Sequence, residues 1–149
     1  MSMIIPFSEI SSFQRPQQVV LTNGCFDILH IGHLRYLQAA RALGAFLWVG
    51  VNSDRSVRAL KGPERPLNNQ DHRAELLAGL RCVDAVTIFD EATADALIEA
   101  IMPQKYAKAG DYSLDNLPEA PTLLRLHIEA VFLPFVAGQS STRLISQLS

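Results

Sequence analysis

The stretch VVLTNGCFDILHIGH, residues 19–33, determines the fold that the sequence predicts. Residues 19–22 form a short apolar run rich in β-branched side chains, and it ends in Asn23-Gly24, a pair typical of turns. A helical pattern of apolar residues follows over residues 32–43. The stretch therefore predicts a strand, a turn and a helix in direct succession, with His30 and His33 at the start of the helix.

The same alternation of strand and helix continues along the chain. Parallel strands need crossover connections, which are usually helices, so this order predicts an α/β domain with a five-stranded parallel sheet flanked by helices. Asn68 or Asn69 can cap the third helix, and residues 111–121 predict a surface loop or a short helix. The predicted strands are residues 19–22, 46–51, 85–89, 106–109 and 130–133, and the predicted helices are residues 32–43, 56–60, 68–80, 93–102 and a last one from near Ser140.

Length and composition narrow the possible functions. The 149 residues, 48% of them hydrophobic, suffice for one domain with a buried core, so we expect a single domain over residues 1–149. The net charge is −2 without any run of basic residues, which argues against nucleic acid or an anionic membrane as a partner. We expect a cytoplasmic protein, because no secretory signal or membrane-spanning segment occurs and Cys25 and Cys82 form no disulfide framework.

Polar residues gather where the predicted strands end. In an open parallel sheet, ligands bind beyond the carboxyl ends of the strands, so these residues indicate a binding site. The first strand is followed neither by a Walker loop nor by a Gly-x-Gly-x-x-Gly motif, so the sequence gives no support to a P-loop kinase or a dinucleotide-binding protein. The residues concerned are 22–24, 52–54, 108–111 and 138–142.

His30 and His33 suit a polyphosphate ligand. Residues three positions apart share a helix face, and the free N–H groups and positive dipole end of a helix N-terminus favour an anion. Gly32 allows close approach to the backbone, and imidazole N–H groups can donate to phosphate oxygens. Two plainer interpretations remain open for an isolated His-x-x-His: half of a metal site, or polar groups that satisfy a helix end.

The pattern His-x-Gly-His after Gly-x-Phe-Asp resembles the cytidylyltransferase-like nucleotidyltransferases, over about residues 18–148. The resemblance implies a Rossmann-like nucleotidyltransferase fold with strand order 3-2-1-4-5. Within this group, five segments are most similar to the adenylyltransferases for D-glycero-β-D-manno-heptose 1-phosphate, which supply ADP-heptose for lipopolysaccharide core assembly. These segments are residues 21–30, 51–54, 60–62, 65–68 and 110–112.

The resemblance also implies roles for individual residues. His33, His30 and Lys61 are the implied catalytic residues, with His33 nearest the reacting α-phosphate. Lys61 and Arg73 are implied to neutralise phosphate charge, although either could be an ordinary surface charge, Arg73 on the solvated face of a helix. The implied nucleotide-binding residues are Thr22, Asn23, Gly24, Phe26, His30, His33, Arg73, Gly110, Asp111, Ser140, Ser141 and Thr142.

Three positions depart from the family pattern. Ala109 replaces the first Gly of Lys-Gly-Gly-Asp, and Ser141 replaces a Thr. Val136-Ala137 stands in place of the Arg-Thr-Glu of the glycerol-phosphate cytidylyltransferases, which argues against that branch. Two alternatives to adenylyl transfer stay open: a glycerol-3-phosphate cytidylyltransferase and a noncatalytic nucleotide-sensing module on the same fold.

The reaction expected from the resemblance joins AMP from ATP to a sugar phosphate and releases pyrophosphate. The partners would be ATP and a phosphorylated small-molecule acceptor, with Mg²⁺ as the cofactor and no dedicated protein metal site. The segment before Val19 is too short for the sugar kinase that is fused to some heptose enzymes, so we expect a separate kinase to supply the acceptor. The resemblance further implies a homodimer.

Overall fold

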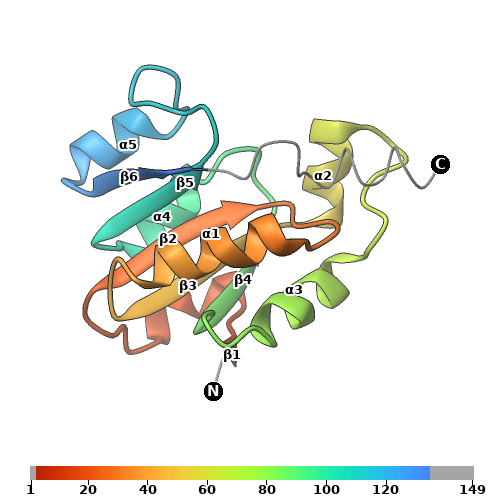
Figure 1. Cartoon of the computed structure of the whole chain (residues 1–149), viewed down its shortest axis with the longest axis horizontal. Helices are drawn as coiled ribbons and strands as arrows, with labels where there is room; N and C mark the ends of the chain where they lie inside the picture. Colours follow the sequence, from red (N-terminus) through yellow and green to blue (C-terminus); the bar gives the residue numbers. More distant parts are fainter. Residues whose placement is uncertain (1–2, 135–149) are drawn as a thin grey trace.

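A six-stranded parallel sheet forms the centre of the protein (Figure 1). The computed structural model describes residues 3–134. The strand order is β1-β4-β3-β2-β5-β6, and every neighbouring pair is parallel. The strands are β1 (Met3–Ile4), β2 (Val19–Gly24), β3 (Phe46–Asn52), β4 (Ala85–Phe89), β5 (Lys105–Ala109) and β6 (Glu129–Leu133).

Helices cover both faces of this sheet (Figure 1). Leu37 of α1 and Leu77 of α3 pack with Val20 on one face, whereas Ile98 of α4 and Leu123 of α5 belong to the cluster on the other. None of the helices within residues 3–134 is both long enough and apolar enough to cross a lipid bilayer. The helices are the 3₁₀ segment η1 (Phe7–Ser12), α1 (Ile31–Arg41), α2 (Asp54–Lys61), α3 (Gln70–Ala78), α4 (Asp95–Ile101) and α5 (Ala120–Arg125).

The fold class predicted from the sequence is confirmed, with one correction to the sheet. The five predicted strands correspond to β2–β6, in the order that the resemblance implies, but within residues 3–134 the sheet has six strands instead of five. The additional strand β1 pairs with β4, Met3 lying opposite Ala85. Thr87 of β4 reinforces this edge, because its hydroxyl donates to the Ile5 carbonyl at 2.8 Å. Two residues are too few to show an alternating pattern, so β1 left no signal in the sequence.

The helix starts follow from capping side chains. The Asn69 side chain accepts a hydrogen bond from the His72 N–H at 2.8 Å, which selects Asn69 as the cap of α3 from the two predicted candidates. Ser53 caps α2 in the same manner, accepting from the Ser56 N–H at 3.2 Å. The predicted loop or short helix at residues 111–121 is mainly an exposed loop, with α5 beginning at Ala120. The predicted helix near Ser140 lies outside the described residues.

Candidate functional site

The two histidines of the motif together form the start of α1. His30 is the N-cap residue, and its Nδ1 accepts from the Gly32 N–H at 3.0 Å. The Nδ1 of His33 accepts from the His30 N–H at 3.2 Å, so the two rings satisfy backbone donors reciprocally, as Ser and Glu do in a capping box. The ring centroids are 3.9 Å apart. This pairing fixes both rings at the carboxyl edge of β2.

The same hydrogen bonds determine which ring nitrogen carries the proton. A neutral imidazole has one acceptor and one donor nitrogen, so accepting at Nδ1 leaves the proton of each ring on Nε2. Burial, followed by the positive charges of His30 and Lys61, lowers the pKa of His33 from 6.5 to about 4. Burial also lowers the pKa of His30. Near neutral pH, each histidine is therefore a neutral Nε2–H donor.

The depressed pKa of His33 makes the stability of the protein depend on pH. The folded state binds a proton at His33 less readily than the unfolded chain, so stability is present above pH 6.5 and declines as the pH falls towards 4. One proton changes the free energy of unfolding by at most about 1.4 kcal/mol per pH unit. Because the ring is only partly buried, we expect the slope due to His33 to stay below this limit. Chemical denaturation of wild type and His33→Gln at several pH values measures it. Equal slopes for the two proteins between pH 6.5 and 4 would contradict this assignment.

Lys61 lies close enough to His33 for its charge to affect the imidazole. It ends α2, which follows the carboxyl end of β3, and it is exposed. The structure thus brings the three residues predicted as catalytic to one region of the sheet edge. Two donor rings and an exposed ammonium suit a polyphosphate, because they supply hydrogen bonds and positive charge.

Arg73 is a buried connector between the strand ends, so the interpretation that it lies on a solvated helix face is wrong. Only 1% of it is exposed. Its guanidinium donates to the carbonyls of Cys25 and Asn52, both at 2.7 Å, so it joins the ends of β2 and β3. It also donates to the Asn68 carbonyl at 2.8 Å and to Asp54 at 2.8 Å. Direct contact with nucleotide phosphate stays a prediction from the resemblance.

The other predicted residues on β2 and in the following turn contact neighbouring side chains that hold them in place. Thr22 is fully buried, and its hydroxyl pairs with that of Tyr36. The side-chain oxygen of Asn23 accepts from the Tyr106 hydroxyl. Phe26 packs against the His33 ring with centroids 5.5 Å apart, and a side chain at Gly24 would meet the Phe26 ring at 3.1 Å. Their contacts with nucleotide stay predictions.

Asp27 belongs to the candidate site, although the sequence predicted no role for it. Its buried carboxylate accepts from the N–H groups of Leu67 and Asn68 and from Nε of Arg65, at 2.9–3.0 Å. Burial alone would raise the pKa of Asp27, but these donors outweigh it and the pKa lies below its ordinary value. Through these hydrogen bonds, Asp27 holds the loop after Lys61 against the turn that precedes His30. The Gly-x-Phe-Asp motif contained this residue, but its partners lie about 40 positions away.

The remaining predicted residues are divided between the loop after β5 and the end of the chain. Gly110 has a φ of +96°, which a residue with a side chain rarely adopts, and Asp111 beside it is exposed. Ser140, Ser141 and Thr142 lie outside the described residues. Within residues 3–134, no group of three or more His, Cys, Asp or Glu is placed to hold a metal ion.

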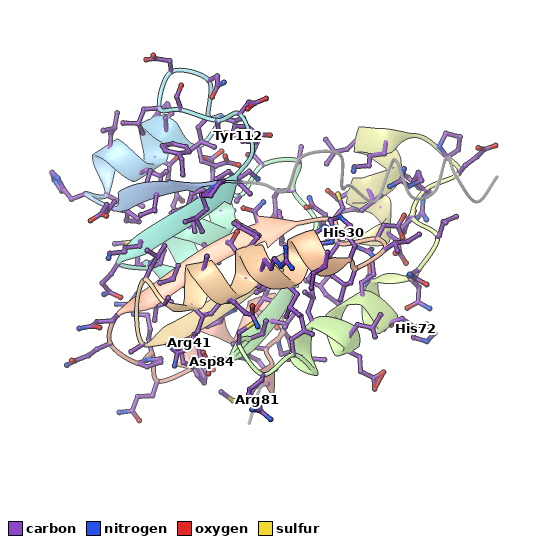
Figure 2. The ribbon with its side chains drawn as sticks, viewed as in Figure 1. His30, Arg41, His72, Arg81, Asp84 and Tyr112 are labelled. Carbon is purple, nitrogen blue, oxygen red and sulfur yellow. The ribbon has the colours of Figure 1, made fainter. Side chains whose placement is uncertain are left out.

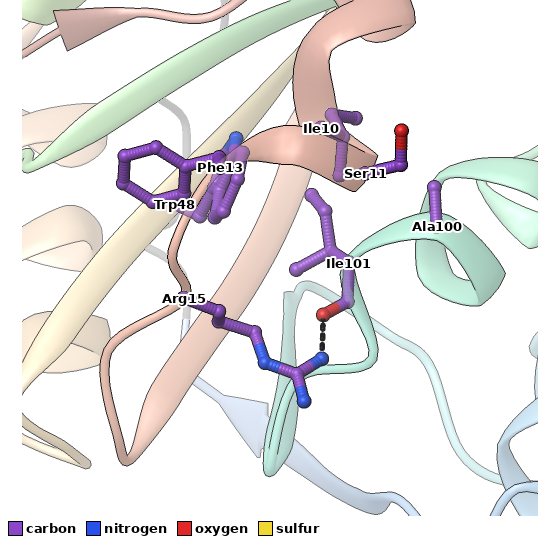
Figure 3. Close-up of a pocket in the computed structure, with 7 residues that line it drawn as sticks. All are labelled: Ile10, Ser11, Phe13, Arg15, Trp48, Ala100 and Ile101. Atoms are coloured by element: carbon purple, nitrogen blue, oxygen red, sulfur yellow. Dashed lines mark hydrogen bonds between the residues drawn. The ribbon is translucent and has the colours of Figure 1, made fainter.

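Two cavities lie at opposite edges of the sheet. A cavity of about 250 Å³ borders the histidines and is lined by Leu29, His30, Ile31, His33, Leu34 and Leu80. A second cavity of about 240 Å³ lies between η1 and the end of α4, where Arg15 donates to the Ile101 carbonyl (Figure 3). Arg15 precedes β2 and Ile101 precedes β5, so this second cavity lies at the amino edge, away from the histidines.

Comparison with known proteins agrees with this geometry. Residues 21–146 match the cytidylyltransferase-like family. The chain is 47% identical to the D-beta-D-heptose 1-phosphate adenylyltransferase of Bordetella bronchiseptica, covering 93% of this chain and 86% of that one. It is also 47% identical to the bifunctional protein HldE of Trichlorobacter lovleyi, covering 95% of this chain and 29% of that one, so it spans under a third of such bifunctional relatives.

A solved structure shows the same arrangement of elements. The lipopolysaccharide core biosynthesis protein from Thermoplasma volcanium superposes with a TM-score of 0.67 at 26% identity, covering 81% of this chain and 98% of that chain. The family that the His-x-Gly-His pattern indicates is thereby confirmed. On the matched residues and on the fold, the chain belongs to the cytidylyltransferase-like family.

Proposed function

We propose that the protein transfers AMP from ATP to a sugar phosphate, D-glycero-β-D-manno-heptose 1-phosphate, and releases pyrophosphate. The observation that carries this proposal is the pair of neutral imidazoles, each with its proton on Nε2, at the carboxyl edge of β2, with Lys61 beside them. The relative from Bordetella bronchiseptica, 47% identical over 93% of this chain, is named for adenylyl transfer to this sugar phosphate. ATP is a cytoplasmic substrate, so the proposed reaction belongs in the cytoplasm.

The proposed mechanism is a direct in-line displacement. An oxygen of the acceptor phosphate forms a bond to the α-phosphorus of ATP, and the bond from that phosphorus to the bridging oxygen of the β-phosphate breaks, so pyrophosphate leaves. His33 donates from Nε2 to a nonbridging oxygen of the α-phosphate, and Lys61 neutralises charge on the triphosphate. No covalent enzyme intermediate forms, because both reactants are held in line.

We expect Mg²⁺ to be bound together with ATP in this reaction. The described residues offer no carboxylate cluster at the site, and Asp27 and Asp54 already accept hydrogen bonds from arginines. This donor set fits an ion held mainly by phosphate oxygens and water, as Mg²⁺ commonly is in nucleotide sites. The ion would offset the charge of the triphosphate. That role and the expected homodimer are predictions from the resemblance.

The proposal is tested with a matrix of nucleoside triphosphates and phosphorylated acceptors, read by pyrophosphate release. We expect the fastest turnover with ATP and heptose 1-phosphate. Faster turnover with CTP and glycerol 3-phosphate would instead identify a glycerol-3-phosphate cytidylyltransferase. Nucleotide binding without pyrophosphate release from any pair would identify a sensing module.

Lys61→Ala should weaken ATP binding and turnover together. A flexible ammonium attracts the phosphates in the ground state as well as in the transition state, so its loss should lower ATP affinity by about tenfold and also reduce kcat. Calorimetric titration with ATP and steady-state kinetics measure the two effects. Arg58→Ala is the matched control, because Arg58 is an exposed cation on the same helix. Equal effects of the two substitutions would remove the role of Lys61.

Cys25→Ser should leave kcat within about twofold of wild type, because the displacement needs no nucleophile from the protein. Cys25 contributes its backbone carbonyl to Arg73, a contact that serine retains. Pyrophosphate release by the folded variant measures the effect. Loss of turnover with unchanged ATP affinity would show that the thiol takes part in the reaction.

A further inference from the structure

Lys108 lies at the carboxyl edge of the sheet, and the proposed mechanism gives its positive charge no role. It lies near the carboxyl end of β5, which pairs with β2. Side chains alternate along a strand, so Lys108 shares a face with Tyr106, whose hydroxyl reaches Asn23 of β2. Lys105 and Ala107 face the other side, where Lys105 donates to the Leu43 carbonyl beyond α1 at 3.1 Å. Lys108 and α1 are therefore on opposite faces of the sheet.

The ammonium of Lys108 contacts an aromatic ring but forms no ion pair within residues 3–134. Its Nζ lies 5.3 Å from the centroid of the Tyr112 ring, a distance suited to a cation–π contact. In the part of the chain that the structure describes, no carboxylate comes within the 4.0 Å of an ion pair with it. Burial lowers the pKa of Lys108, and the charge of Glu119 acts in the opposite direction.

Glu119 has spare hydrogen-bonding capacity in the same neighbourhood. Only 4% of it is exposed, and its Oε2 accepts from the Ala94 N–H at 2.8 Å. Its Oε1 is buried and has no hydrogen-bond partner among residues 3–134. A half-buried cation and a buried carboxylate oxygen that do not satisfy each other are costly in a folded protein. A phosphate oxygen of a ligand would satisfy the ammonium of Lys108, whereas Oε1 of Glu119, an acceptor, would be satisfied by a hydroxyl group of the same ligand.

We propose that Lys108 binds the phosphate group of the acceptor sugar, with the Tyr112 ring and the charge of Glu119 holding its ammonium in place. This inference rests on the proposed function. In the proposed function, the triphosphate of ATP is bound by His30, His33 and Lys61, which lie around the start of α1. The acceptor brings a second phosphate, which needs a cation of its own. Lys108 supplies one on the opposite face of the sheet, and Figure 2 shows Tyr112 and His30 separated along the sheet.

The decisive variant is Lys108→Met, which keeps the length of the side chain and removes its charge. Titration with heptose 1-phosphate alone and with ATP alone separates the two ligands, and steady-state kinetics gives KM for each. We expect the Kd and KM for heptose 1-phosphate to rise about 10- to 100-fold, as for a lost charged hydrogen bond, with the Kd for ATP within about twofold of wild type. Lys105→Met is the matched control, since it removes an ammonium from the same strand on the other face.

Three outcomes would overturn the inference: unchanged acceptor affinity, an equal loss of ATP affinity, or the same effect in Lys105→Met. Thermal melting of each variant shows whether it folds, and Lys108→Arg should recover acceptor binding because it restores the charge. Tyr112→Leu should weaken acceptor binding by about two- to fivefold, as for loss of an exposed cation–π contact.

Failure of the proposed function would be visible separately. Wild-type protein that binds heptose 1-phosphate but releases no pyrophosphate would refute adenylyl transfer, while the titrations would still decide the role of Lys108. Wild-type protein that releases pyrophosphate with another acceptor, and shows no binding of heptose 1-phosphate in the titration, would overturn the assignment of Lys108 to this sugar phosphate.

Discussion

His33→Ala should lower kcat by about 10²–10³, with a smaller change in ATP affinity. The ring is neutral and carries its proton on Nε2, because its Nδ1 accepts from the His30 N–H and its pKa lies at about 4. A donor fixed in this manner needs no reorganisation when charge shifts at the α-phosphate, so its contact strengthens in the transition state. Loss of one such preorganised donor corresponds to about 3–4 kcal/mol of transition-state stabilisation.

The measurement is turnover together with direct titration of ATP on the folded variant. His33→Gln retains an amide donor and should recover part of the rate. His127→Asn is a suitable control, because His127 is an exposed histidine with a φ of 57°, a conformation that asparagine tolerates. Near-normal kcat in His33→Ala would remove the assigned role, whatever the affinity of the variant for ATP.

Asp27→Asn should lower the free energy of unfolding by about 3 kcal/mol. The carboxylate is buried and accepts from Arg65 and from two backbone N–H groups, and an amide presents a donor where one of its oxygens now accepts. Removing one partner of a buried, hydrogen-bonded pair leaves the other charge without compensation. The loop that Asp27 holds directly follows Lys61, so its loss of order should displace Lys61, and we also expect weaker ATP binding.

Urea denaturation near neutral pH measures the loss of stability. Asp90→Asn is the matched control: Asp90 pairs with Arg55 at 3.5 Å, and 60% of its side chain is exposed. That pair should contribute less than about 1 kcal/mol, because water screens exposed charges. Equal losses in the two variants would show that the buried hydrogen bonds of Asp27 do not stabilise the fold.

The strands of the sheet could be predicted because each is a short apolar run bounded by turn residues. β4 has the predicted bounds, and β5 and β6 each begin only one residue earlier than predicted. β1 could not be predicted, since two residues carry no period and the pairing with β4 forms only in the folded chain. The bounds of α5 were equally hidden, because the chain before it is a loop whose end has no capping side chain.

The position of the histidines in the candidate site could be predicted, but the contacts of the buried charged residues around them could not. The position of the histidine pair followed from a motif contained in one strand and one helix start. Arg73 and Asp27 depend on partners from distant segments, namely the Asn52 carbonyl and the Leu67 N–H. Backbone partners carry no residue type that a sequence pattern can reveal, so burial of these two charged side chains emerged only in three dimensions.

The reciprocal capping by His30 and His33 affects how the family can change over evolutionary time. Active sites usually lower stability, and neutral drift can then erode them once selection for the reaction relaxes. Here the rings to which we assign phosphate contacts also satisfy N–H groups that a helix start would otherwise leave without partners. Descendants that lost the reaction should therefore keep the two histidines for longer than Lys61, which no such structural demand retains.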